Sequence, residues 1–209
     1  MRKRILHLTG FVLAGGSSRR MGRAKAGLIL QGQTMLARQA RLLGRVAGRV
    51  AVVGFHPEDD KDLEVPMIPD ELPGRGPLGG IYTGLLQTGT EYNLFLGCDM
   101  PFVNRRLLRC VAQRAFETGA DATVAESSDG RLQTLCAVYR RRARWAVRAS
   151  LAAGDNKLRS FFSKVDCEII PWRDLARAGF LPSMFDNMNA PADYESARKR
   201  LEPSPGTTA

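Results

Sequence analysis

Hydrophobic positions fall along the chain in short apolar runs that alternate with longer amphipathic stretches. Residues 8–13, 50–53 and 92–96 are short, mainly apolar runs, which is typical of strands buried on both faces of a sheet. After Asn104, apolar residues recur at helical spacing over 107–116. Strands that alternate with helices predict an α/β fold of three layers, with a mostly parallel sheet covered by helices on both faces.

Helix-start signals and further apolar runs extend this prediction along the chain. Thr34 is an expected N-cap for a helix that runs to about Val46, Pro77 opens a helix, and Asn104 caps another. Further expected elements are strands at 65–68, 122–125, 135–139 and 167–170, a long basic helix after residue 139, a short helix around 158–162 and a last helix from Pro191. Residues 1–201 are expected to form a single domain, followed by a disordered tail over 202–209.

The loop after the first strand has the composition of a phosphate-binding loop. Ligands of parallel sheets bind where the carboxyl ends of strands meet, at a switch in strand order. This loop reads Leu13-Ala14-Gly15-Gly16-Ser17-Ser18-Arg19-Arg20-Met21-Gly22-Arg23-Ala24-Lys25. Its glycines let backbone N–H groups approach phosphate oxygens, while Arg20 and Lys25 add charge that can neutralise a triphosphate. It matches neither a Walker A loop nor Gly-x-Gly-x-x-Gly, and the alternative interpretation is a basic surface turn.

The loop after residues 92–96 reads Gly97-Cys98-Asp99-Met100-Pro101 and places a carboxylate at the end of a buried strand. Burying an unpaired carboxylate there costs several kcal/mol, and a divalent cation that bridges it to phosphates removes this cost. Magnesium needs only one or two protein carboxylates. Asp99 is therefore a candidate metal ligand. The alternative is a capping or turn residue, although Asn104 is the better cap.

Two further segments are weaker candidates. Asp70 precedes a glycine-rich turn, 74–80, that opens a helix, so Asp70 could accept hydrogen bonds from a guanine edge or a ribose. Asn187 and Asn189 precede the last helix, and their amides can both donate and accept toward a polar ligand. A plain turn explains the first segment, and turn or capping roles explain the second, equally well.

Charge and cysteine content narrow the class of protein. Lys and Arg outnumber Asp and Glu by 31 to 21, which favours polyanionic ligands. The arginines are scattered over helix surfaces, and the densest cluster, Arg140–Arg144, has no interleaved aromatic except Trp145, so nucleic-acid binding is not indicated.

The four cysteines form no Cys-x-x-Cys pair, which argues against disulfides or a structural zinc and suits a reducing cytoplasm. No apolar run is long enough for a membrane span, and the basic start is read as a first strand, not a secretory signal.

Taken together, these stretches resemble the molybdenum cofactor guanylyltransferase family, within the MobA-like nucleotidyltransferases. The resemblance is carried by four stretches that span nearly the whole chain: Leu13-Ala14-Gly15-Gly16 through Arg20-Met21-Gly22 and Lys25; Asp70 with Gly76-Pro77-Leu78; Gly97-Cys98-Asp99-Met100-Pro101; and Asn187-Met188-Asn189-Ala190-Pro191. It implies a Rossmann-like nucleotidyltransferase fold and a reaction in which molybdopterin-bound molybdenum and GTP yield the guanine dinucleotide form and pyrophosphate. Leu-Ala-Gly-Gly is similar to the GTP-using form, whereas Leu-Ala-Ala-Gly is similar to the CTP-using form.

The resemblance also implies roles for individual residues. The backbone of Leu13, Ala14, Gly15 and Gly16 would hold the base, and Lys25 would contact phosphates. Asp70 would lie beside the nucleoside, and Asp99 would bind Mg²⁺ with the nucleotide. The candidate site also includes Arg20, Asn187 and Asn189. Cofactor-delivery proteins or molybdoenzyme chaperones are the implied protein partners. The chain departs from the family at Ala24, where Asp is frequent, and at 53–56, where an Asn is usual. Four alternatives stay open: a cytidylyltransferase, a sugar- or lactyl-phosphate nucleotidyltransferase, a non-catalytic GTP-binding protein and a basic RNA-associated protein.

Overall fold

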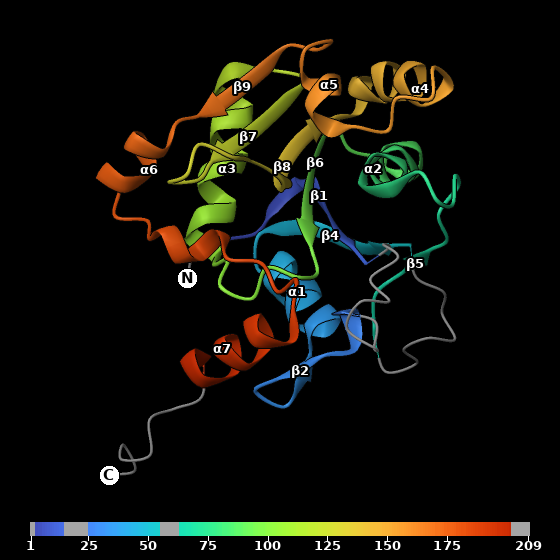
Figure 1. The fold of residues 1–209 in the computed structure, drawn as a ribbon. Coiled ribbons are helices and arrows are strands. Elements are labelled where there is room, and N and C mark those ends of the chain that lie inside the picture. Colours follow the sequence, from blue (N-terminus) through green and yellow to red (C-terminus); the bar gives the residue numbers. More distant parts are fainter. Residues whose placement is uncertain (1–2, 15–24, 55–62, 202–209) are drawn as a thin grey trace.

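The fold is built on one sheet of seven strands in the order β5-β4-β1-β6-β8-β7-β9. The structure is a computed structural model, and it describes residues 3–14, 25–54 and 63–201 (Figure 1). The strands are β1 (Ile5–Leu13), β4 (Ala47–Val53), β5 (Met67–Ile68), β6 (Tyr92–Gly97), β7 (Ala122–Glu126), β8 (Leu132–Arg140) and β9 (Cys167–Ile170). All pair in parallel except β8, which runs antiparallel to β6 and β7. The predicted mostly parallel sheet is confirmed.

The reversal of β8 was not predicted, although the sequence carries its signal. β7 and β8 form a hairpin whose turn contains Asp129 and Gly130, a dipeptide that favours hairpins between two strands. Gly130 has a positive φ of 79°, which glycine adopts without a steric penalty. Ser127 closes the turn, because its amide donates to the Arg131 carbonyl. The hairpin places β8 beside β6, so β8 runs back toward the amino end of the parallel strands.

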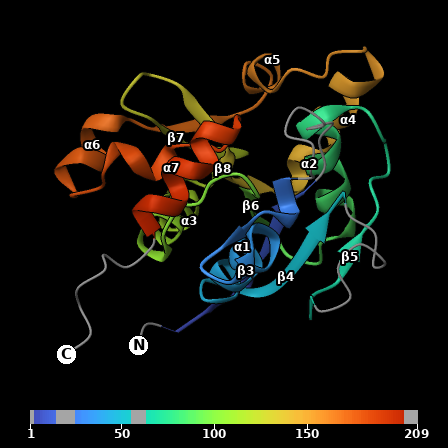
Figure 2. The same cartoon turned by 60° about the horizontal axis from the view of Figure 1, so that its bottom comes forward.

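Helices cover both faces of the sheet and produce two separate apolar cores (Figures 1 and 2). One face carries α1 (Met35–Gly44), α3 (Arg105–Thr118) and α6 (Trp172–Arg177), and the other carries α2 (Gly76–Gln87), α4 (Arg144–Ala152) and α5 (Leu158–Phe162). Alternation along β1 divides its side chains between them: Val12 lies in the first core, and Phe11 and Leu13 lie in the second. The predicted three-layer architecture is confirmed.

Most predicted element ends agree with the structure. The Thr34 hydroxyl accepts a hydrogen bond from the Ala37 amide at 3.1 Å, and Asn104 Oδ1 accepts one from Leu107 at 3.0 Å, so both are the expected caps. The expected long basic helix is divided into a 3₁₀ turn, η3 (Arg141–Ala143), and the short α4. Helix α6, the 3₁₀ turns η2 (Lys25–Gly27) and η4 (Pro182–Phe185), and the strands β2 (Ile29–Leu30) and β3 (Gln33–Thr34) were not predicted.

Helix α2 packs unusually close to the sheet because glycines face it. A Cβ at Gly84 would lie 2.7 Å from the Phe95 ring, and a Cβ at Gly80 would lie 3.0 Å from Leu13 Cδ2. Any larger residue would push α2 away from β1 and β6. The close approach holds the amino end of α2 beside the carboxyl end of β1, where Leu13 ends the strand.

The last helix, α7 (Pro191–Leu201), forms a small third core with the β2–β3 hairpin (Figure 1). Met188 and Ala197 pack there against Leu30 and Met35. The Tyr194 hydroxyl donates to the Ile29 carbonyl at 2.8 Å, which ties the two segments together. The hairpin begins directly after η2, so the C-terminal helix supports the chain just beyond Lys25. The tail 202–209 lies outside the described residues.

Candidate functional site

The candidate site lies at the carboxyl edge of the parallel strands, where four strands end in register. Leu13 of β1 pairs with Val53 of β4 and with Gly97 of β6, and Val53 pairs with Ile68 of β5. The loops that follow these residues therefore leave the sheet at one level. Neighbouring strands are about 4.8 Å apart, so the row from Ile68 to Gly97 spans about 14 Å.

The switch in strand order falls between β1 and β6. From β1 the chain moves outward through β4 and β5, and then returns to β6 on the other side of β1. Open α/β sheets bind ligands at this kind of switch. The two loops that the sequence singled out, those after Leu13 and Gly97, both begin here, and the Cys98 amide donates to the Leu13 carbonyl at 3.2 Å.

The loop around Asp99 is anchored to three different parts of the chain. Cys98 is hydrogen-bonded to β1 as described above, and the Asp99 carbonyl accepts a hydrogen bond from the Met188 amide at 2.9 Å. The Met100 carbonyl accepts one from Gln39 Nε2 on α1 at 2.6 Å. Three consecutive residues are thus fixed by three separate elements. A carboxylate on such a loop is held in position before any ligand binds.

The Asp99 side chain lies against the backbone of Gly97. A Cβ added to Gly97 would lie 2.9 Å from Asp99 Oδ1, a separation that real Cβ atoms essentially never show. Gly97 therefore leaves the space in which the carboxylate rests at the end of β6. Asp99 is partly exposed, whereas Cys98 and Met100 on either side are buried. Because Asn104 caps α3, capping does not explain why an acidic residue stands at position 99.

Asp70 lies at the same sheet edge, two residues beyond β5, and α2 orients it. The buried Thr83 hydroxyl is 2.8 Å from Asp70 Oδ1 and accepts a hydrogen bond from the Glu71 amide at 3.0 Å. The hydrogen bond to Thr83 thus holds Asp70 at Oδ1. The glycine-rich turn adopts positive φ at Gly74 and Gly76 and leads into α2 as predicted.

The segment that contains Asn187 and Asn189 is brought beside Asp99 by the Met188 amide. Met188 is buried, with 1% of its surface exposed, while the two asparagines on either side are exposed. Asp193 Oδ2 accepts hydrogen bonds from the Asn189 and Ala190 amides, both at 2.8 Å, in the manner of a cap before α7. The Asn189 backbone thus takes part in a cap, and the backbone of Met188, between the two asparagines, is bonded to the Asp99 loop.

The cationic loop is described only at its two ends. Leu13 and Ala14 leave β1 at the switch point, and the Ala14 amide donates to the Val53 carbonyl at 3.0 Å. The chain is described again at η2, whose backbone packs on α1. Gly15, Gly16 and Arg20 lie outside the described residues, and so does the Lys25 side chain. The segment that precedes the loop thus lies at the same edge as Asp99.

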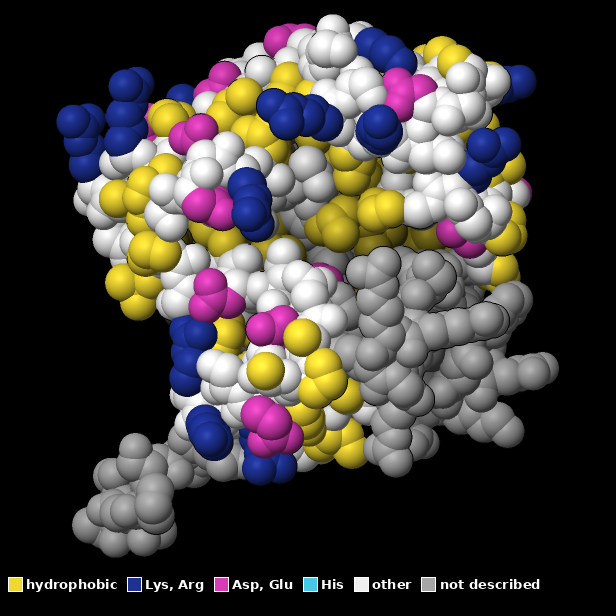
Figure 3. Space-filling view, in the orientation of Figure 1, with side chains coloured by type: hydrophobic (Ala, Val, Ile, Leu, Met, Phe, Trp, Pro, Cys, Tyr) yellow, Lys and Arg dark blue, Asp and Glu magenta, His cyan; other side chains and the backbone are white. Residues whose placement is uncertain are grey.

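Figure 3 shows this face of the molecule hollowed between the part that carries β7 and β8 above and the part that carries α1 and α7 below. Hydrophobic side chains line the hollow, and Lys and Arg side chains stand above it. A separate pocket of about 220 Å³ lies beyond Pro101, between Phe102 and α7. It is bordered by Asn187 and by Arg200, whose guanidinium stacks on the Phe102 ring at 3.8 Å and pairs with Asp186.

The acidic residues of the site fit one kind of metal better than others. Within residues 3–14, 25–54 and 63–201, no three His, Cys, Asp or Glu side chains gather to form a metal site by themselves. Zinc takes four protein ligands in structural sites and three in catalytic sites, so the described residues do not fit it. A single carboxylate at a ligand-binding edge fits Mg²⁺, which is held by one or two carboxylates together with substrate phosphates.

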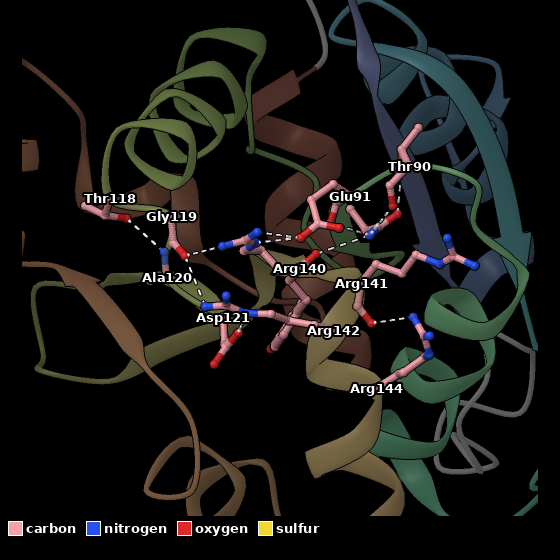
Figure 4. A network of polar contacts seen from close by, with 12 residues as sticks. Thr90, Glu91, Thr118, Gly119, Ala120, Asp121, Arg140, Arg141, Arg142 and Arg144 are labelled. Atoms are coloured by element: carbon pink, nitrogen blue, oxygen red, sulfur yellow. Dashed lines mark hydrogen bonds and ion pairs between the residues drawn. The ribbon is translucent and has the colours of Figure 1, made fainter.

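The arginine cluster 140–144 has a structural role and lies at the opposite edge of the sheet (Figure 4). We expected a solvated helix surface, but Arg140 ends β8. Its guanidinium bonds to Glu91 at 2.6 Å and to the Gly119 carbonyl at 2.7 Å. Arg142 pairs with Asp121, and Arg144 stacks on Trp145 at 4.6 Å. These partners tie β8 to the segments that precede β6 and β7.

Sequence reasoning missed two residues that orient the site, Gln39 and Thr83. Each is a polar residue on a helix face that otherwise packs against the sheet, and each is buried. A polar side chain at an apolar position of the helical repeat was the available signal, because buried polar groups require hydrogen-bond partners.

All four cysteines are free in the structure. Burial raises the pKa of the Cys136 thiol to about 12, and burial together with nearby Asp166 and Glu168 raises that of Cys167 to about 11. None of the helices in the described part of the chain has the length and apolar character that a membrane span requires.

Comparison with known sequences gives consistent matches. Residues 10–169 match the MobA-like NTP transferase domain. A protein named probable molybdenum cofactor guanylyltransferase from Pelotomaculum thermopropionicum is 34% identical over 200 residues, which is 96% of each chain. A protein of the same name from Mycobacterium tuberculosis is 37% identical over 164 residues, which cover 76% of this chain and 81% of that one.

Solved structures share the fold. The crystal structure of molybdopterin-guanine dinucleotide biosynthesis protein A from Archaeoglobus fulgidus has a TM-score of 0.79 and 22% identity, covering 92% of this chain and 97% of that one. The 2-C-methyl-D-erythritol 4-phosphate cytidylyltransferase from Thermus thermophilus has a TM-score of 0.66 and 16% identity, with coverages of 91% and 96%. At these identities the structural likeness establishes the nucleotidyltransferase architecture alone.

Proposed function

Because the chain belongs to the MobA-like NTP transferase family, we propose that it transfers GMP from GTP to the molybdopterin-bound molybdenum cofactor and releases pyrophosphate. The product is the guanine dinucleotide form of the cofactor. The observation that carries this proposal is the match, over nearly the whole chain, to a relative named probable molybdenum cofactor guanylyltransferase. Three of the candidate stretches begin at one edge of the sheet: the loop after Leu13, the segment with Asp70 and the loop with Asp99. This arrangement supports the proposal independently, because the reaction requires a nucleotide and an anionic acceptor side by side.

The reaction needs positioning and charge stabilisation more than acid–base chemistry. An oxygen of the acceptor's terminal phosphate attacks the α-phosphorus of GTP, and the bond from this phosphorus to the β-phosphate oxygen breaks. Pyrophosphate leaves with that electron pair. Since the acceptor is already an anion, no side chain has to remove a proton. In this proposal Arg20 and Lys25 neutralise the triphosphate and hold it in line with the acceptor.

Asp99 would hold Mg²⁺ together with the triphosphate, and Asp70 would contact the nucleoside. When bound, the metal supplies charge that stabilises the departing pyrophosphate. The described geometry supports this division: Asp99 rests at the end of β6, adjacent to β1, while Asp70 lies beyond β5, three strands away from β6 along the row. The base would then lie over the backbone of Leu13–Gly16, between the two carboxylates. Asn187 and Asn189 would contact the acceptor, since Met188 places them on the Asp99 side.

The test is to measure pyrophosphate release from GTP, CTP and ATP, each with Mg²⁺, in the presence and absence of molybdenum-loaded molybdopterin. We expect release only with GTP and only with the acceptor, and we expect the guanine dinucleotide as product. Preferential release from CTP would indicate the cytidylyltransferase alternative. Tight GTP binding without release with this acceptor would contradict the proposal and favour a non-catalytic binding protein.

A further inference from the structure

Gln39 of α1 occupies a core position where packing alone calls for an apolar residue. It lies on the buried face of α1 together with Leu36 and Leu43, and only 1% of its surface is exposed. Its Oε1 atom is buried and has no hydrogen-bond partner in the described structure. A methionine or leucine would fill the same space without burying an unpaired polar atom. The advantage of an amide at this position must therefore come from its nitrogen atom, Nε2.

The Nε2 atom of Gln39 donates a hydrogen bond of 2.6 Å to the carbonyl of Met100. Met100 is buried and directly follows Asp99, and the next residue is a proline, which has no N–H group. The stretch from Asp99 to Phe102 belongs to no helix or strand, so it lacks the ladder hydrogen bonds that hold β6 in place. Gln39 compensates by attaching this stretch to a helix that is itself packed on β1 and β4.

The hydrogen bond from Gln39 acts one residue further along the chain than the hydrogen bond from Met188. The Asp99 carbonyl is fixed by the Met188 amide, and the next carbonyl along the chain is fixed by Gln39. The two successive peptide units that follow the Asp99 Cα are thereby held in place, the first by the segment before α7 and the second by α1. Gly97, which precedes Asp99, leaves room for Oδ1, and the two fixed carbonyls follow the Asp99 Cα, so contacts on both sides along the chain position the carboxylate.

From this arrangement we infer that Gln39 is a positioning residue for the nucleotidyl transfer, and that it acts by fixing the Asp99 carboxylate through the Met100 carbonyl. Gln39 does not touch substrate, because it is buried behind the loop. The inference rests on the proposed function, since it assigns Asp99 to the metal–triphosphate group. Small displacements of such a group can reduce a rate by about a hundredfold.

The central variant is Gln39→Met, which preserves length and volume and removes both the donor and the unpaired acceptor. We expect kcat for pyrophosphate release to fall by about 10- to 100-fold, while KM for GTP changes by less than about threefold. Thermal stability should stay close to that of the wild type, because removal of the unpaired Oε1 offsets the loss of the hydrogen bond. Gln39→Glu, which keeps an acceptor facing the Met100 carbonyl and loses the donor, should lower kcat at least as much.

A second readout does not depend on metal, nucleotide or activity. Hydrogen exchange of the backbone amides of Cys98, Asp99 and Met100, measured without ligands, should be at least about tenfold faster in Gln39→Met than in the wild type. The matched control is Leu43→Ala, which opens a cavity on the same face of α1 without touching the loop. It should lower stability and leave both kcat and the exchange of these three amides unchanged.

The outcomes separate the two proposals. A wild-type protein that releases no pyrophosphate with any triphosphate would overturn the proposed function, while the exchange measurement would still test the anchor. If the loop amides of Gln39→Met exchange at the wild-type rate, the anchoring role is wrong. If they exchange faster and kcat is unchanged, the loop is anchored but Gln39 does not position the reaction. If Leu43→Ala loses kcat to the same degree, general destabilisation explains the effect and the inference fails.

Discussion

The amide of Met188 donates a hydrogen bond of 2.9 Å to the carbonyl of Asp99. This bond joins the segment before the last helix to the loop after β6, two stretches that are far apart in the sequence. It brings the backbone between Asn187 and Asn189 beside the Asp99 loop, and β1 pairs with β6, the strand from which this loop leaves. A nucleotide held over β1 and an acceptor held by the asparagines would therefore meet at Asp99.

The carboxylate of Asp99 should be essential for turnover and dispensable for folding. In Asp99→Asn the side chain keeps its shape and loses its charge, so the metal–triphosphate group loses its protein ligand. We expect kcat for pyrophosphate release to fall by about a hundred- to a thousandfold, or roughly 3–4 kcal/mol of transition-state stabilisation. The unfolding midpoint should be close to that of the wild type. Asp166→Asn, a matched change at an exposed position, should be fully active. Near-normal turnover in Asp99→Asn would refute the assignment of Asp99.

Gly97 should matter because of the space that it leaves for Asp99. The Cβ of Gly97→Ala would lie 2.9 Å from Asp99 Oδ1, so the carboxylate must rotate away. The obstructed atom is the end of a flexible side chain, so we expect a loss of kcat of about tenfold or more with a change in stability of about 1 kcal/mol or less. A Cβ at Gly44 meets nothing within 4 Å, which makes Gly44→Ala the control. Equal steady-state rates for the two variants would show that the contact has no functional effect.

The hydroxyl of Thr83 should set the orientation of Asp70. Thr83→Val keeps the methyl group and removes the hydrogen bond to Asp70 Oδ1 and the acceptor for the Glu71 amide. We expect KM for GTP to rise about five- to tenfold with a smaller change in kcat, and the free energy of unfolding to fall by about 1–3 kcal/mol. Thr118, whose hydroxyl likewise bonds to a carbonyl four residues earlier in its helix, supplies the control Thr118→Val. If both variants bind GTP equally well in calorimetry, Asp70 does not need this support.

Asp155 should make folding stability depend on pH in the acid range. Its pKa is lowered from 3.8 to about 2, first by the hydrogen bond from Ser160 and then by Lys164 and the Lys157 amide. A carboxyl whose pKa is depressed by folding stabilises the protein above its ordinary pKa, and this contribution disappears as the pH falls through the folded value. The stability difference between wild type and Asp155→Asn, from urea midpoints, should be constant from neutral pH to about pH 4 and then shrink toward pH 2. A difference that does not vary over this range would exclude the linkage.

Local signals in the sequence determined much of the secondary structure. The caps Thr34 and Asn104 contact amides only three residues away, so the residues that form them stand together in the chain. The runs that became β1, β4 and β6 are mainly apolar because these strands are covered on both faces. The same patterns indicated the candidate residues Asp70 and Asp99, since polar side chains at the ends of buried strands face the ligand edge of a parallel sheet.

Only the tertiary structure decided how these residues are held. The bond from Gln39 to Met100 joins residues 61 positions apart, and the pairing of Leu13 with Gly97 depends on β6 returning beside β1. The helical repeat shows that Gln39 is a polar residue at an apolar position, but it does not show its partner. A long-range partner is chosen by strand order and helix packing, whereas the sequence pattern reflects each residue's immediate neighbours. The sequence by itself thus determined which helices and strands form and which functional side chains follow the strands. The folded sheet decided that the ends of these strands meet, because strands that end in register bring their loops to the same edge.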